Sequence, residues 1–263
     1  MSTSPKGFDP RKSTSARVLN HLLGGKDAFG VDQKLADDMM SLAPDTKTMA
    51  WFSRQFLTGS ARLAAQNGVR QFLDMGAGMP IEPTVHDTVQ AIHPDGRVAY
   101  VDHDPVVVTH WEGLYSGIPG VAAILGDLCD PDAILDEAQE RALVNFAEPV
   151  AVLLVGVLPF IADADDPAWI VSRLRDRMAP GSYIAITQSS LTSDPEFIRQ
   201  VTAATSVSAH PIVWRSAEQV SEFLAGFEVL EPGVTTIQDW LAPDLPQTGL
   251  VTYGVIGRKP GSS

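Results

Sequence analysis

The sequence has little cysteine and little positive charge, and each shortage excludes a class of protein. Its single cysteine, Cys129, can form no internal disulfide and cannot build a cysteine-based metal site. Because Cys129 lies close after the apolar run 121–125, we expect it to pack in the interior and not to act as a nucleophile. The six histidines are scattered, without the spacing of a zinc-binding helix, so we expect no metal site.

Lysine and arginine together number 19 against 32 aspartates and glutamates, which gives a net charge of −13. A surface this acidic repels phosphate backbones, so we expect no nucleic-acid partner. The longest apolar run, 150–161, is about half as long as a membrane crossing requires. Residues 1–10 contain no apolar segment of the kind that directs secretion. These absences favour a cytoplasmic protein that acts away from membranes.

Hydrophobic residues make up 44% of the 263 residues, enough for the core of one large α/β domain. Before residue 69 the apolar spacing is helical. We expect helices over about 13–23, from about 32, and over 45–67, with Gly68 ending the third. We interpret residues 1–68 as a helical cap or lid on a domain that spans 69–263, the two forming one compact unit.

From residue 69 onwards, short apolar runs alternate with helical stretches. The expected strands are 70–74, 97–102, 121–126, 150–156 and 182–188. The expected helices between them are 82–92, 105–114, 131–141 and 167–178. This alternation predicts a parallel sheet with helices on both faces. A helix over 216–224 then precedes two runs, 227–237 and 249–257, which predict an antiparallel strand pair because no helix separates them.

The first expected strand runs directly into the turn Gly76-Ala77-Gly78. Glycines let the backbone turn sharply and come close to a ligand, and the amides of a following helix favour a negative group. A plain tight connection is the alternative interpretation. The dinucleotide fingerprint would need a third glycine where this chain has Ile81, so a pyrophosphate ligand loses support.

Acidic residues follow the next two strands. Asp102 closes the second strand, a position from which a carboxylate accepts hydrogen bonds from ribose hydroxyls. We expect Asp104 to cap the helix after it, and His103 either lies along an adenine ring or is an exposed loop residue. After the third strand, Asp127 can accept from an adenine amino group and the Leu128 amide can donate to the ring, although a simple turn is the alternative.

One nucleoside-shaped ligand at the carboxyl edge of the sheet would account for all three signals, because the carboxyl ends of parallel strands meet there. Without pyrophosphate recognition, a methionine-containing nucleoside fits better than a dinucleotide. Two other functions stay open at this stage. One is an NAD(P)-dependent oxidoreductase, which shares the ribose-binding carboxylate, and the other is a non-catalytic regulatory protein that binds this methionine-containing nucleoside.

Asp74-x-Gly76-x-Gly78, Asp102 and 126–128 together resemble the successive motifs of class I S-adenosylmethionine-dependent methyltransferases. The chain also resembles a bacterial subgroup of these enzymes whose substrates are largely unassigned. That likeness is carried by the segments 16–18, 22–29, 71–74, 101–105 and 174–183. It spans roughly residues 13–259 and implies a Rossmann-like, mostly parallel sheet of seven strands with the last strand antiparallel.

The resemblance implies S-adenosylmethionine as the cofactor and methyl transfer as the activity. By position, it implies the methionine part near 76–78, the ribose near Asp102 and the adenine near 127–128. The full set of expected cofactor-binding residues is Asp74, Gly76, Ala77, Gly78, Asp102, His103, Asp127, Leu128 and Gly156. Relatives often carry a histidine at the position of Pro159, which this chain lacks, and no residue stands out as a general base.

We expect the methyl acceptor to be a small molecule that enters between the cap, the loop after Gly156 and the segment 189–214. The segment Gly24–Phe29 is interpreted either as a lid over the cofactor or as a loop that ends a helix. His86 is expected to be a surface or packing residue and not a base. Three tryptophans are expected in the core or in the acceptor wall: Trp51, Trp169 and Trp214. The sequence gives no indication of the oligomeric state.

Overall fold

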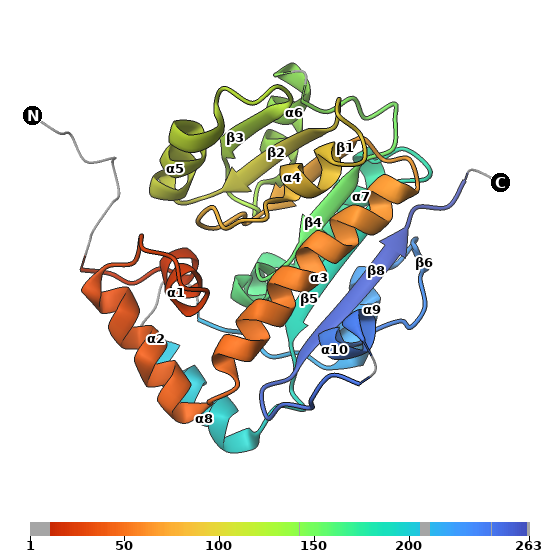
Figure 1. Cartoon of the computed structure of the whole chain (residues 1–263). Helices are drawn as coiled ribbons and strands as arrows, with labels where there is room; N and C mark the ends of the chain where they lie inside the picture. Colours follow the sequence, from red (N-terminus) through yellow and green to blue (C-terminus); the bar gives the residue numbers. More distant parts are fainter. Residues whose placement is uncertain (1–10, 142, 206–210, 243, 262–263) are drawn as a thin grey trace, which may run out of the picture.

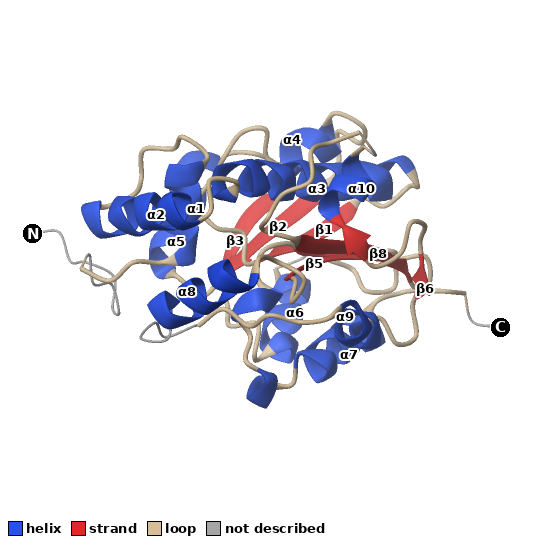
Figure 2. Ribbon diagram, turned by 90° about the horizontal axis from the view of Figure 1, so that it is seen from below, coloured by secondary structure: helices blue, strands red, loops and turns tan. Residues whose placement is uncertain are grey.

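The computed structural model describes residues 11–141, 143–205, 211–242 and 244–261, and it shows a central sheet with helices on both faces (Figures 1 and 2). The strands are β1 (Gln71–Met75), β2 (Arg97–Asp102), β3 (Val121–Leu125), β4 (Ala151–Leu154), β5 (Tyr183–Ser189), β6 (Glu228–Val229), β7 (Thr235–Thr236) and β8 (Thr252–Arg258). The α-helices are α1 (Ser15–Leu22), α2 (Gly30–Leu42), α3 (Thr46–Gln66), α4 (Val85–Gln90), α5 (Pro105–Tyr115), α6 (Pro131–Glu140), α7 (Pro167–Arg177), α8 (Pro195–Thr205), α9 (Ala217–Phe223) and α10 (Ile237–Leu241). Two short 3-10 helices follow β4: η1 (Leu158–Phe160) and η2 (Asp163–Asp165).

The strands lie in the order β3-β2-β1-β4-β5-β8-β6, and β7 pairs with β8 beside this path. Strands β1 to β5 are parallel, whereas β8 runs antiparallel to β5. The chain builds outward from β1 to β3 on one side and then returns to place β4 on the other side of β1. Such a reversal of strand order leaves a crevice at the carboxyl ends of the strands, where ligands of open α/β sheets bind.

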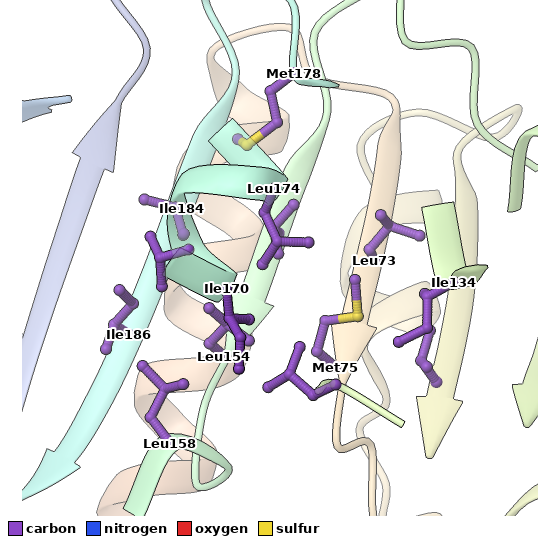
Figure 3. Packing of buried hydrophobic residues seen from close by; sticks show 14 of the residues in the cluster. Leu73, Met75, Ile134, Leu154, Leu158, Ile170, Leu174, Met178, Ile184 and Ile186 are labelled. Carbon is purple, nitrogen blue, oxygen red and sulfur yellow. The ribbon is translucent and has the colours of Figure 1, made fainter. Parts of the chain in front are cut away.

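Each face of the sheet buries its own hydrophobic layer because side chains alternate along a strand. Leu73 and Met75 of β1 pack with α6, α7 and α9, whereas Phe72 packs with α3, α4, α5 and α10. Figure 3 shows part of the first layer, in which Ile170 of α7 lies beside Leu154 of β4 and Leu174 lies further along the same helix. The parallel strands are buried on both faces, which explains why they are almost continuously apolar in sequence.

Several helices begin at an aspartate that is followed by proline. Asp104 accepts a hydrogen bond from the Val106 amide at the start of α5, and Asp130 accepts one from Ala133 at the start of α6. Proline at the first helical position loses no hydrogen bond there, and the aspartate satisfies a free amide of the first turn. This local chemistry confirms the expected starts of these two helices.

The expected alternation of five parallel strands and four helices is confirmed, and so is the antiparallel end of the chain. The sheet has eight strands, one more than expected, because the run 227–237 is broken by a turn containing Pro232 and Gly233. Its two halves, β6 and β7, both pair with β8, and α10 begins directly after β7. Helix α8, inside the segment 189–214, was not predicted.

The N-terminal helices lie at the carboxyl end of the parallel strands, where the arrowheads of β4 and β5 point (Figure 1). Val18, Leu22, Ala36 and Ala50 form a small core among α1, α2 and α3. Helix α3 also continues along the sheet, where Phe52 and further residues belong to the layer above β1 and β4. The division of the chain at residue 68 stays a prediction.

Candidate functional site

The three sequence signals come together at the carboxyl edge of β1, β2 and β3. The amides of Gly76 and Ala77 both donate to the carbonyl of Val101, at N–O distances of 2.8 and 3.0 Å. The Gly126 amide donates to the carbonyl of Asp102 at 3.0 Å. Each loop is therefore hydrogen-bonded to the end of β2, and the structure confirms that they are neighbours.

The turn after β1 requires glycine at two positions. Gly76 has a φ of 69° and Gly78 a φ of 64°, in the left-handed region that strains other residues. A Cβ added at Gly76 would lie 2.8 Å from Cγ2 of Val157, in the loop after β4, so the two loops are in close contact. The turn thus leaves bare backbone at the reversal of strand order.

Asp102 is a buried carboxylate, with 6% of its surface exposed. Its Oδ2 accepts from the Gly78 amide and its Oδ1 from the Asp104 amide, both at 2.9 Å. Burial raises the pKa of the Asp102 carboxyl, and these two hydrogen bonds act against that rise. Each oxygen has a second lone pair, so a fixed carboxylate can still accept from ligand hydroxyls.

The remaining expected residues differ in how accessible they are. Asp127 is exposed, and its Oδ1 accepts from the Cys129 amide at 2.9 Å, so the turn interpretation of this segment is confirmed while the carboxylate stays accessible. Leu128 is buried. His103 is 57% exposed, with Nδ1 3.6 Å from Oδ1 of Asp102. Gly156 is exposed, and its amide donates to Oγ1 of Thr187 at 2.8 Å.

Asp74 lies at the end of β1, almost completely buried just before the glycine turn. Burial raises the pKa of its carboxyl to about 7, Arg54 of α3 acts to lower it, and Asp102 raises it further. Arg54 donates through Nη2 to the carbonyls of Ile81 and Pro83, in the loop that continues the glycine turn. Sequence reasoning missed Arg54 because nothing in α3 distinguishes it from a surface arginine.

An aromatic cluster supports the glycine turn from the side of α5. Nε1 of Trp111 donates to the Gly78 carbonyl at 2.8 Å, and the indole stacks on Tyr100 with ring centroids 3.6 Å apart. The Tyr100 hydroxyl lies 2.8 Å from Nδ1 of His86, which is buried. Burial lowers the pKa of His86, so its ring is neutral and packed, as expected. Trp111 was not predicted to support the turn.

Helix α1 of the cap reaches the same turn. Ala16 is the nearest neighbour of the position that a Cβ on Gly78 would occupy, at 4.0 Å. Arg17 is buried, donates through Nε to Oδ2 of Asp32 at 2.8 Å, and has Nη1 3.7 Å from Oδ2 of Asp104. In the segment Gly24–Phe29, the Asp27 amide donates to Oδ1 of Asn20 at 3.0 Å. Whether this segment moves as a lid stays a prediction.

A second buried arginine, Arg215, fixes the loop after β4. Its guanidinium donates to the carbonyls of Leu158 and Ile161, at 3.0 and 2.7 Å, and to Oδ1 of Asp163 at 2.8 Å. It also donates to Oε1 of Gln188 in β5 at 2.9 Å. The Val213 amide also donates to the Pro159 carbonyl at 2.7 Å, so the loop after Gly156 contacts the end of the segment 189–214, of which 206–210 lie outside the described residues. That the acceptor enters there stays a prediction, and Arg215 itself was not predicted.

The expectation about Cys129 is wrong in part, whereas for the tryptophans the structure bears only on the core and leaves the acceptor wall a prediction. Cys129 is exposed instead of packed inside, because the chain turns outward after Leu128. The pKa of its thiol is raised to about 11, first by burial and then by Asp127 and Asp165, which agrees with the expectation that it is no nucleophile. Trp51 and Trp169 are 51% and 45% exposed and so lie outside the core, whereas Trp214 packs against Phe197.

The strand order, the glycine turn after β1 and the acidic loops after β2 and β3 define the fold of a class I S-adenosylmethionine-dependent methyltransferase. A sequence profile described as S-adenosyl methyltransferase matches residues 1–260, so the chain belongs to this family. The chain is therefore a methyltransferase with S-adenosylmethionine as its cofactor. This assignment decides against the nicotinamide-dependent and non-catalytic alternatives.

Solved structures agree with the family. A DUF574 family protein from Streptomyces avermitilis is similar over 94% of this chain and 98% of that chain, with a TM-score of 0.88 and 32% identity. A proposed methyltransferase from Thermobifida fusca covers 98% of both chains, with a TM-score of 0.89 and 35% identity. The N-methyltransferase NodS from Bradyrhizobium japonicum, solved with S-adenosyl-L-homocysteine, shares the fold alone, at a TM-score of 0.51 and 14% identity over 94% of this chain and 100% of that chain. No curated protein matches this chain.

Within the described residues, no helix combines the length and the apolar character that a membrane crossing demands.

The substitution Asp74→Asn should stabilise the protein most at alkaline pH. The folded-state pKa of about 7 lies above the ordinary 3.8, so the folded protein holds the proton more tightly and wild-type stability falls as the pH rises towards 7. The free energy of unfolding of Asp74→Asn, relative to the wild type, should therefore rise by ~2–3 kcal/mol between about pH 5 and pH 8. Urea unfolding at both pH values measures it, with the exposed Asp95→Asn as control. An advantage that is equal at the two pH values would contradict the raised pKa.

Proposed function

We propose that the site at the ends of β1, β2 and β3 binds S-adenosylmethionine and that the chain methylates a small-molecule acceptor. The observation that carries this proposal is the Asp102 carboxylate, which backbone amides on two loops hold at the reversal of strand order. A carboxylate fixed in this way can accept hydrogen bonds from two neighbouring ribose hydroxyls without reorganising. When bound, the cofactor supplies a methyl group that is already activated by the positive sulfonium.

The residues present fit this cofactor. The positive φ angles of Gly76 and Gly78 give a turn whose bare backbone can approach the methionine part. A Cβ added at Gly156 would meet nothing within 4 Å, so the space beside this glycine is open. The exposed carboxylate of Asp127 can accept from the adenine amino group, and His103, which is also exposed, can lie along the adenine face.

Asp74 is proposed to bind the ammonium group of the methionine part. Its carboxyl lies at the end of the strand that leads into the glycine turn, and it is close enough to Asp102 for the two charges to repel. A buried carboxylate with a raised pKa is stabilised when a cation arrives beside it. Perturbed carboxyl groups of this kind are concentrated at functional sites, where their cost in stability is tolerated.

The acceptor is proposed to meet the methyl group between the cap, the loop after β4 and the segment 189–214. The hydrogen bond from the Val213 amide to the Pro159 carbonyl joins the last two, and Arg215 fixes the loop after β4 to β5, which supports this placement. The net charge of −13 disfavours nucleic acid as an acceptor and supports a small molecule. The work left to the protein is to align the acceptor and exclude water, because the methyl group needs no further activation.

The substitution Asp102→Ala should weaken the binding of S-adenosylhomocysteine by ~1–3 kcal/mol, because ribose hydroxyls would lose a buried acceptor. Isothermal titration calorimetry measures this loss. Asp95→Ala is the matched control, since Asp95 is an exposed aspartate at the opposite end of β2 and should leave the affinity unchanged. Equal affinities for wild type and Asp102→Ala would remove Asp102 from the site.

The affinity for S-adenosylhomocysteine should fall as the pH is lowered from 8 to 6, by about tenfold, if Asp74 binds the ammonium group. The sign follows from the raised pKa of about 7, since a proton then occupies the carboxyl that the ammonium needs. Asp74→Asn should bind more weakly at pH 8 and lose this pH dependence. Methylthioadenosine, which lacks the amino-acid part, is the control ligand. A pH dependence equal for both ligands would contradict this role of Asp74.

The small-molecule acceptor is tested with S-adenosylmethionine that carries a labelled methyl group. A cell extract is separated by ultrafiltration into small molecules and macromolecules, and each fraction is incubated with the enzyme and the labelled cofactor. Label should enter the small-molecule fraction, and Asp102→Ala should reduce the rate of incorporation. Label found only on protein or nucleic acid would overturn the proposed acceptor class while leaving the cofactor site intact.

A further inference from the structure

We propose that Arg17 is a positioning residue for the cofactor site, because through Asp104 it holds the cap against the loop that carries Asp102. The cap then fixes the position of the loop that would bind the ribose. This inference rests on the proposed function, since it assumes that Asp102 contacts the ribose. It adds a role for a buried arginine that belongs to the cap.

Arg17 lies where a charged side chain is costly, with only 1% of its side chain exposed. Nε donates to Oδ2 of Asp32, which is itself fully buried, and Nη2 donates to the carbonyl of Lys12. Asp32 also accepts from the amides of Thr14 and Phe29. The pair therefore holds together the start of α1, the start of α2 and the segment before α1.

The same guanidinium faces a second carboxylate outside the cap. Nη1 of Arg17 lies 3.7 Å from Oδ2 of Asp104, whose side chain is 12% exposed. An ion pair with so little water around it is screened less than one on the surface. This contact is an ion pair between helix α1 of the cap and the loop that follows β2.

Asp104 transmits the position of the cap to the proposed ribose site. Its amide donates to Oδ1 of Asp102, and its own carboxylate caps α5 through the amide of Val106. Two further observations concern the same boundary. Cβ of Ala16 is 4.0 Å from the position that a Cβ on Gly78 would occupy, and Nε2 of His110 in α5 is 3.8 Å from Oδ1 of Asp27. Cap and cofactor loop therefore move together.

The cleanest test changes Asp104 and not Arg17, because removing Arg17 would leave the buried Asp32 without its cation and threaten the fold. Asp104→Ser keeps a side chain that can cap α5 but removes the charge that faces Arg17. Asp130→Ser is the matched control, since Asp130 caps α6 in the same Asp-Pro setting. The binding of S-adenosylhomocysteine is measured by calorimetry, and hydrogen exchange of residues 15–29 is measured with and without that ligand.

In the wild type and in Asp130→Ser, S-adenosylhomocysteine should slow hydrogen exchange in α1 and in 24–29. In Asp104→Ser the affinity should fall about tenfold, and most of this slowing should be lost even at saturating ligand. Thermal unfolding without ligand should be similar for all three proteins, which separates positioning from a loss of folding.

Asp104→Ser with the affinity and ligand-dependent exchange of the wild type would overturn the role of Arg17 and leave the cofactor site standing. A wild-type protein that fails to bind S-adenosylhomocysteine would overturn the proposed site and, with it, this inference. A weaker affinity in both serine variants would also contradict it, because the loss would then come from the helix cap and not from the ion pair.

Discussion

The hydrogen bond from the Gly78 amide to the Asp102 carboxylate is the interaction on which the rest of the site depends. It joins the turn after β1 to the end of β2, with 2.9 Å between N and Oδ2. The carbonyl of Gly78 is held as well, because it accepts a hydrogen bond from Nε1 of Trp111. Because its amide and carbonyl are both bonded, the backbone at Gly78 cannot rotate without losing two hydrogen bonds, and the turn is fixed before any ligand arrives.

Three arginines fix the positions of the segments around this turn, although the protein is strongly acidic overall. Arg17 joins α1 to α2, Arg54 joins α3 to the loop after the glycine turn, and Arg215 joins the loop after β4 to β5. A guanidinium presents several donors in one plane, so it can satisfy carbonyls and carboxylates from different segments at once. The segments around the site are therefore held by polar contacts of these arginines as well as by hydrophobic packing.

Sequence reasoning located the glycine turn, Asp102 and the cap role of Asp104 because each depends on chemistry within a few residues of a strand end. It did not find Arg54, Trp111 or Arg215, whose partners lie between 27 and 57 residues away in the chain. It also misjudged Cys129, since burial depends on which way the chain leaves the sheet and not on the apolar run before it. The run 227–237 forms two short strands, β6 and β7, instead of one long strand. The turn between them becomes evident only from their separate pairing with β8.

The sequence by itself determined the class of fold, the order of strands and helices, and the loops that meet at the carboxyl edge of the sheet. These follow from the hydrophobic period and from helix caps, both of which act locally along the chain. Only the tertiary structure decided that a buried arginine of the cap faces Asp104 and that the carboxyl of Asp74 has a pKa of about 7. Both depend on burial and on charges brought close from distant segments, and no local pattern in a sequence encodes those distances.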